Sequence, residues 1–170
     1  MPELIISATR SFVEMYNKAM KPSPTSFLKR INYRHMLYLL KGIIELPTTY
    51  YKDKANVAYI WMHEICRTVL DRFTDDSEKL DLYERTKDIA SRLFDVPGNI
   101  FMDKDQIGEP FFSYGYGDSL YNESPEPSKV ESMLTDLVLE YNKANPREEL
   151  DIIIFNTVVE KCLKINRSIR

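Results

Sequence analysis

The chain has 170 residues, enough for one domain or for one domain with a helical extension. Its formal net charge of −3 provides no basic surface, so neither nucleic acid nor an anionic membrane is an expected partner. The chain has no run of about eighteen apolar residues, the length needed to span a bilayer. Residues 1–6 lack the basic start of a signal peptide, and Cys66 and Cys162 stand alone in helical patterns. We therefore expect an intracellular protein with reduced cysteines.

Apolar residues at helical spacing dominate the first half of the chain and predict four helices. The first covers residues 3–20 and ends before two prolines, which lack the backbone donor that a helix needs. Asn32 is a suitable N-cap for the second, which Pro47 ends. The third is expected over residues 54–73. Asp76 or Ser77 is expected to cap the fourth, which ends near Phe94 at a turn.

Residues 99–127 differ from the rest, because they hold three of the five glycines and six aromatic side chains. Structureless loops of this length are uncommon, and this one is too aromatic for a disordered linker. We therefore predict an ordered connector that lies across a helical surface.

Two more helices are expected after the connector. Ser128 and Glu131 have the spacing of a capping box at the start of the fifth helix, which Pro146 ends. The sixth is expected from Asp151 to about Ile169, although residues 152–155 also fit a buried strand. The predicted fold class is thus all-α, a bundle of about six helices with a long ordered aromatic connector.

Patterns that indicate catalysis are weak. The phosphate-binding loop G-x-x-x-x-G-K-[ST] does not occur. His63 and Glu64 begin like the helix motif of zinc proteases, but Arg67 stands where the second histidine ligand would be. The sequence therefore favours a structural role for His63 over a role as a zinc ligand in a small metal hydrolase. Asp75 and Asp76 lie at a helix start, where carboxylates complement the helix dipole. We predict no catalytic residue and no metal ligand.

Two polar features stand out on the helices. Arg34 lies in the first turn of the second helix, where its positive charge opposes the helix dipole. Together with exposed backbone donors, its guanidinium could hold a phosphate, although a solvated arginine is the simpler interpretation. On the third helix, His63, Arg67 and Asp71 follow at four-residue steps along one face. Arg67 and Asp71 are therefore predicted to pair.

The segment from Ile60 to Phe73 resembles the dynein heavy-chain pattern L-W-x-H-E-x-x-R-V-x-x-D-R-L. The matching residues are Trp61, His63, Glu64, Arg67, Asp71 and Arg72. Upstream, residues 27–34, which include Asn32 and Arg34, resemble H-Y-x-F-N-L-R-D, with Gly42 in the following helix. Downstream, residues 140–142, 153–155 and 165–167 are similar to the family's E-Y-N, L-V-L-F and R-I-x-R segments.

This resemblance covers about residues 4–170. It implies an AAA+ lid, that of the third AAA+ module, at residues 1–98, a connector at 99–127, and the opening helices of the fourth module at 128–170. It also implies that Arg34 is the sensor-two arginine, which reaches the terminal phosphate of a nucleotide on the preceding subdomain. The family usually has an acidic residue where this chain has His35, and H-Y where it has Ser26-Phe27.

The resemblance implies a non-catalytic lid fragment of an ATP-hydrolysing microtubule motor. It implies ATP or ADP in the intact motor and no cofactor in this chain. The implied partners are neighbouring AAA+ subdomains and, through the motor, microtubules. The implied location is the cytoplasm and cytoskeleton, with the axoneme of a cilium or flagellum favoured. The alternative is a free-standing helical interaction module that docks through its tyrosine-rich connector.

Overall fold

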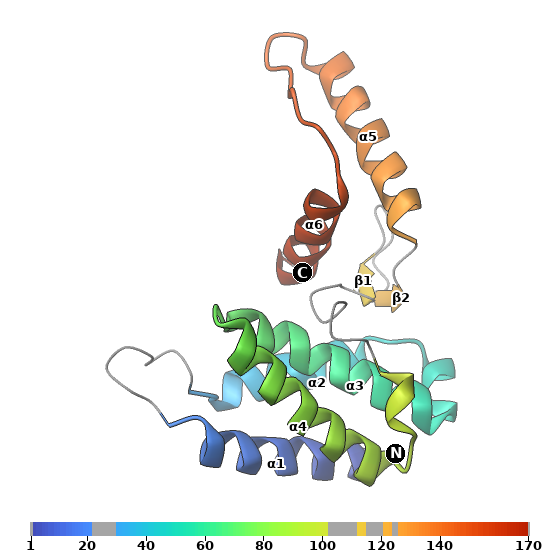
Figure 1. The fold of residues 1–170 in the computed structure, drawn as a ribbon. Coiled ribbons are helices and arrows are strands. Elements are labelled where there is room, and N and C mark those ends of the chain that lie inside the picture. The colour runs from blue at the N-terminus through green and yellow to red at the C-terminus, as the bar shows by residue number, and fades with distance from the viewer. Residues whose placement is uncertain (1, 22–29, 102–111, 115–120, 124–125, 170) are drawn as a thin grey trace. The chain divides into compact units, whose positions relative to one another are not determined.

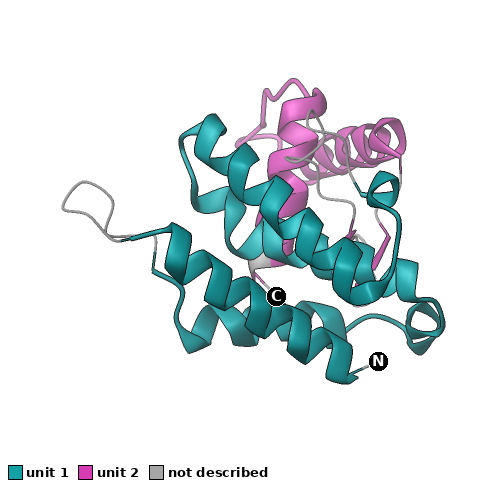
Figure 2. Ribbon diagram, turned by 60° about the horizontal axis from the view of Figure 1, so that its bottom comes forward, with its two compact units in different colours: residues 1–108 teal, residues 109–170 magenta. Residues whose placement is uncertain are grey.

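A computed structural model of the chain describes residues 2–21, 30–101, 112–114, 121–123 and 126–169. The chain forms two compact units, residues 1–108 (unit 1) and residues 109–170 (unit 2), coloured separately in Figure 2. The all-α prediction is confirmed, because the described residues form six α-helices and only one short hairpin. None of these helices is both long and apolar enough to cross a membrane.

The described part of unit 1 contains four α-helices and three short 3-10 turns (Figure 1). Its elements are α1 (Pro2–Ala19), α2 (Tyr33–Ile44), η2 (Thr48–Lys52), α3 (Lys54–Thr68), η3 (Leu70–Arg72), α4 (Asp76–Phe94) and η4 (Gly98–Ile100). α3 packs against both α2 and α4, and α4 packs against α1, so α3 is the central helix. Ten of the eleven residues from Val57 to Arg67 are buried, the exception being Tyr59.

Trp61 lies at the centre of the unit 1 core and has no exposed surface. Its ring meets Phe12 of α1 edge-on, with centroids 6.3 Å apart, and packs against Phe94 of α4 at 5.7 Å. The indole Nε1 donates to Thr9 Oγ1 at 3.0 Å, and the Thr9 hydroxyl donates to the Ile5 carbonyl at 2.7 Å. One tryptophan therefore joins three helices and satisfies its polar atom within the core.

The helix boundaries in unit 1 agree with the sequence predictions except at two points. Asn32 caps α2 as expected. Asp75, and not Asp76 or Ser77, caps α4, with its carboxylate accepting from the backbone of Ser77 at 2.8 Å and of Glu78 at 3.2 Å. The α-helical part of the third helix stops at Thr68 instead of residue 73, and the chain continues as η3.

Unit 2 contains a hairpin and two helices. β1 (Phe112–Tyr114) pairs antiparallel with β2 (Tyr121–Glu123), so that Phe112 lies opposite Glu123. The helices are α5 (Pro127–Ala144) and α6 (Asn156–Ile169). A small apolar cluster joins them, formed by Val130, Leu134, Val159 and Leu163, with Ile154 and Cys162 at its margin.

The predicted starts of both helices in unit 2 are wrong. The capping box at Ser128 is absent, because the N-cap is Glu126 and α5 begins at Pro127, two residues earlier than a cap at Ser128 predicts; proline's fixed φ suits the first helical position. α6 begins at Asn156, and residues 151–155 are neither helix nor strand. The side chain of Asn142 accepts from the Leu150 amide at 2.8 Å and donates to the Leu150 carbonyl at 3.0 Å. These two bonds hold the chain in a non-helical conformation before α6.

The aromatic connector contains the hairpin, which the sequence analysis did not predict. Phe101, Phe112 and Tyr121 are buried, and the rings of Phe112 and Tyr121 lie 6.2 Å apart. Residues 102–111, 115–120 and 124–125 lie outside the described residues, as do residues 22–29 before α2. The predicted packing of the whole connector across a helical surface therefore stays a prediction.

Candidate functional site

The candidate site begins at the amino-terminal end of α2, where Asn32 and His35 cap the helix reciprocally. The His35 amide donates to Asn32 Oδ1 at 3.2 Å, and the Asn32 amide donates to His35 Nδ1 at 3.1 Å. This is a capping box in which histidine takes the place of the usual glutamate or glutamine. Two backbone donors that α2 would otherwise leave unpaired are thereby satisfied, and the helix start is fixed.

Arg72 reaches the same imidazole from η3. Its Nη1 lies 3.2 Å from His35 Nε2, so donors approach both ring nitrogens. A neutral imidazole has only one unprotonated nitrogen, and a protonated one has none. Burial lowers the pKa of His35, and the positive charges of Arg72 and Arg34 lower it further. The ring is therefore held neutral, so only one of its two nitrogens can accept a hydrogen bond at a time, and the tautomer decides which of the two contacts is one.

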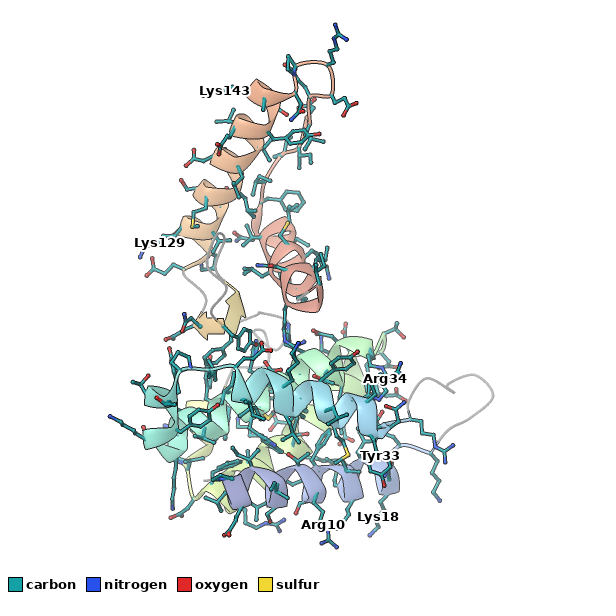
Figure 3. All side chains as sticks on the ribbon, turned by 180° about the vertical axis from the view of Figure 1, so that it is seen from behind. Arg10, Lys18, Tyr33, Arg34, Lys129 and Lys143 are labelled. Carbon is teal, nitrogen blue, oxygen red and sulfur yellow. The ribbon has the colours of Figure 1, made fainter. Side chains whose placement is uncertain are left out.

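Arg34 lies one residue before His35 and is exposed (Figure 3). Within the described ranges, no carboxylate forms an ion pair with its guanidinium. Tyr33 beside it is 85% exposed. The geometry leaves the Arg34 side chain accessible to a group outside unit 1, and the capped helix start gives it a fixed base.

The other residues of the motif are buried in α3. Trp61, His63 and Glu64 have no exposed surface, and Arg67 is 7% exposed. His63 Nδ1 lies 3.3 Å from Glu64 Oε1, a contact between two fully buried side chains. Among the described residues, no group of three or more histidine, cysteine or acidic side chains could hold a metal ion. The burial of His63 agrees with the structural interpretation of that residue.

Glu64 also contacts α2, at Gly42. A Cβ atom added to Gly42 would lie 2.2 Å from Glu64 Oε2 and 2.4 Å from its Cδ. Atoms that close would overlap, so only glycine leaves room for the carboxylate at this point of α2. The glycine in the second helix and the glutamate of the motif in α3 therefore form one contact.

The predicted pairing of Arg67 with Asp71 is confirmed. Arg67 Nη1 lies 3.3 Å from Asp71 Oδ2, and the Arg67 side chain is almost fully buried. Cys66, next to it, is fully buried, and this burial raises the pKa of its thiol to about 12. Cys66 and Cys162 are both free thiols, as expected. The end of α3 is thus tied to η3 by an ion pair, and η3 is tied to α2 by Arg72.

The structure places the predicted residues in two groups. In the first group, Trp61, His63, Glu64 and Arg67 are buried in α3. In the second group, nearer the surface, Asp71 and Arg72 of η3 contact α3 and α2, Asn32 caps α2, and Arg34 is exposed in the first turn of α2. The role of His35 was not predicted, although its three-residue spacing from Asn32 is the signal of a capping box. The role of Thr9 was not predicted either, because its contact with Trp61 spans 52 residues and leaves no local signal.

Comparisons with known proteins point to one family. Over 171 residues the chain is 25% identical to dynein axonemal heavy chain 6 of Homo sapiens, covering 96% of this chain and 4% of that protein. It is 21% identical over 169 residues to the dynein-1-beta heavy chain, flagellar inner arm I1 complex, of Chlamydomonas reinhardtii, covering 97% of this chain and 4% of that protein. It is 23% identical over 165 residues to the ciliary dynein beta chain of Tripneustes gratilla, covering 96% of this chain and 4% of that protein.

No protein-family model and no solved structure matches the chain. The chain spans about 4% of the length of the curated relatives that it matches. Along nearly its whole length, it is related to the heavy chains of axonemal dyneins.

Proposed function

We propose that the chain is a non-catalytic segment of a dynein motor, and that unit 1 is the lid of an AAA+ module. In this proposal the intact heavy chain hydrolyses ATP and moves along microtubules in the axoneme. The lid couples the nucleotide state of the preceding module to movement of the ring. The names of the relatives, which are axonemal, flagellar and ciliary dyneins, support this assignment.

The observation that carries the proposal is the position of Arg34. It is exposed at the start of a capped helix, while Trp61, His63, Glu64 and Arg67 of the same resemblance are buried in the framework behind it. A guanidinium in this position has the chemistry to bind the terminal phosphate of a nucleotide through charge-assisted hydrogen bonds. Lid rotation would follow the presence or loss of that phosphate.

Unit 2 supports the same proposal in a different way. Its buried apolar cluster is small, and many large apolar side chains of unit 2 are exposed. The exposed ones are Met133, Leu137, Leu139, Tyr141, Leu150, Ile152, Ile153, Phe155, Ile165 and Ile169. Exposed apolar surface of this extent is typical of a part that packs against further protein. We propose that residues 128–170 are the opening helices of the next module and that neighbouring AAA+ subdomains cover these side chains.

The proposal is tested by substituting Arg34 in the intact heavy chain. Losing one charge-assisted hydrogen bond to phosphate costs about 1.5–3 kcal/mol, which is a loss of about 10- to 100-fold in nucleotide affinity of the preceding module. Arg34→Ala should show this loss, and Arg34→Lys a smaller one. The thermal stability of the 170-residue chain should not change, because the side chain is exposed. Unchanged nucleotide affinity in Arg34→Ala would rule out a phosphate-reading role.

The segment alone should bind ATP no better than about millimolar, because one arginine without a phosphate-binding loop supplies little affinity. Isothermal titration calorimetry measures this directly. Micromolar binding by the isolated chain would contradict the proposed division of labour between the lid and the preceding subdomain.

A further inference from the structure

Glu64 is an unusual residue to find at the centre of the α3 interface. Its carboxylate has no exposed surface, although carboxylates are almost never fully buried without a specific partner. The side chain extends from α3 to α2 and ends against Gly42, while its Oε1 lies 3.3 Å from His63 Nδ1. The buried carboxylate of Glu64 therefore forms a contact between α3 and α2.

The fit between Glu64 and Gly42 is specific to one position along α2. Both oxygens and the carboxyl carbon of Glu64 lie within 3.0 Å of where a Cβ atom on residue 42 would be. Lys41 and Ile43, on either side, carry Cβ atoms, so a shift of α2 by one residue would bring a side chain onto the carboxylate. Because Glu64 is fully enclosed, it cannot swing away into solvent as an exposed glutamate would. The pair therefore fixes how α2 sits on α3.

Two further contacts hold α2 near this point and near its start. The Tyr51 hydroxyl of η2 donates to the carbonyl of Ile43, next to Gly42. At the other end, Arg72 of η3 lies 3.2 Å from the ring of His35, next to Arg34. Arg34 precedes Gly42 by eight residues, about 12 Å along the helix axis at 1.5 Å per residue. A rigid helix of this length carries a displacement at Gly42 directly to Arg34.

We propose that Glu64 is a positioning residue, whose carboxylate seated on Gly42 sets the position of α2 and thereby places Arg34 for phosphate. This inference rests on the proposed function of Arg34. It gives the glutamate of one sequence segment and the glycine of the other a joint task, which follows from their contact. Misplacing a phosphate-binding group by about 1 Å can cost up to about 100-fold in function, so even a small movement of α2 is measurable.

The test compares Gly42→Ala with Gly98→Ala. A Cβ atom at Gly98 would meet ordinary contacts at 3.5 and 3.6 Å, so this control should be tolerated. Gly42→Ala should lower the thermal midpoint of unit 1 and shift the amide resonances of α2, although alanine is the better helix former. In the intact heavy chain it should lower nucleotide affinity by at least about tenfold. If Gly42→Ala behaves like Gly98→Ala in both assays, the inference is wrong.

A double variant separates positioning from packing. Gly42→Ala combined with Glu64→Ala removes the overlap, so thermal stability should recover relative to Gly42→Ala alone. Nucleotide affinity should stay low, because no carboxylate then fixes the position of α2 at residue 42. Recovery of both properties would show that the contact only fills space and would overturn the positioning role.

Glu64→Gln and Glu64→Ala decide the matter if Gly42→Ala does not fold. Gln keeps the shape of the side chain, so nucleotide affinity should stay within about twofold of the parent. Ala empties the contact and should reduce affinity by about tenfold or more. Equal behaviour of the two would overturn the inference. If Arg34→Ala leaves affinity unchanged while Gly42→Ala still shifts the α2 resonances, the proposed function fails and the contact itself stands.

Discussion

Replacing Thr9 with valine tests the core around Trp61. Valine has the shape of threonine but cannot accept the 3.0 Å hydrogen bond from the indole Nε1. Because Trp61 has no exposed surface, its N–H would be left without an acceptor, which costs about 1–3 kcal/mol. Each kcal/mol corresponds to about 4–8 °C in a domain of about this size. The thermal midpoint of unit 1 should therefore fall by at least about 4 °C.

The assay is intrinsic fluorescence during thermal or urea unfolding. Trp61 is the only tryptophan in the chain, so its emission reports unit 1 and is silent for unit 2. Thr86→Val is the matched control. Thr86 is also fully buried in unit 1 and donates to the Leu82 carbonyl at 2.6 Å. Within the described part of the chain, no donor reaches its hydroxyl. Thr86→Val should therefore cost less than about 1 kcal/mol.

A double-mutant cycle with Trp61→Phe, followed by circular dichroism, isolates the hydrogen bond itself. Phenylalanine has no N–H, so Thr9→Val should destabilise the Trp61→Phe background less than it destabilises the parent. Equal costs in both backgrounds, or equal midpoints for Thr9→Val and Thr86→Val, would refute the assignment of the Trp61–Thr9 bond to the core.

Three further predictions concern other residues. Because the pKa of His35 is lowered in the folded state, the unfolded chain takes up a proton at higher pH than the folded chain. Unit 1 should therefore lose stability as the pH falls below about 6.5. His35→Gln should remove this part of the loss, as measured by urea titrations at several pH values. An unchanged pH dependence in His35→Gln would contradict this. The thiol of Cys66, with its pKa raised to about 12 by burial, should resist maleimide at pH 8 until unit 1 unfolds, whereas Cys162 should react first, and equal rates would be inconsistent with the structure. Asp75→Ala should lower the free energy of unfolding in urea by about 1 kcal/mol, because it removes the cap of α4. Ser128→Ala should lower it by less than about 0.5 kcal/mol, because the Ser128 side chain does not cap α5. Similar losses in the two variants would argue against these helix starts.

The sequence predicts the helices of unit 1 well because their signals are local. Apolar periodicity and the proline after α1 identify the helices, and Asn32 marks the start of α2. The pairing of Arg67 with Asp71 was also predictable, since four-residue spacing brings the two side chains to one face. Arg34 is exposed, as its proposed role requires.

Features that depend on distant contacts were not predictable from the pattern. The periodic residues 152–155 fit a helix, but two hydrogen bonds between Asn142 and Leu150, eight residues apart, hold the preceding chain outside a helix. The capping spacing of Ser128 was misleading, because Pro127 begins the helix two residues earlier than that cap predicts. The contact of Glu64 with Gly42 requires the packing of α3 on α2, which no local pattern encodes. A neighbouring proline and a contact within the loop thus decided the two helix starts, whereas tertiary packing decided the contact of Glu64 with Gly42.

The most direct test is a structure of the intact heavy chain with ATP or a non-hydrolysable analogue bound to the preceding module. The proposal predicts that the guanidinium nitrogens of Arg34 lie about 2.7–2.9 Å from oxygens of the terminal phosphate. It also predicts that α2 keeps its contact with Glu64 at Gly42. A guanidinium that points into bulk solvent, with the nucleotide bound and the lid closed, would contradict the central claim.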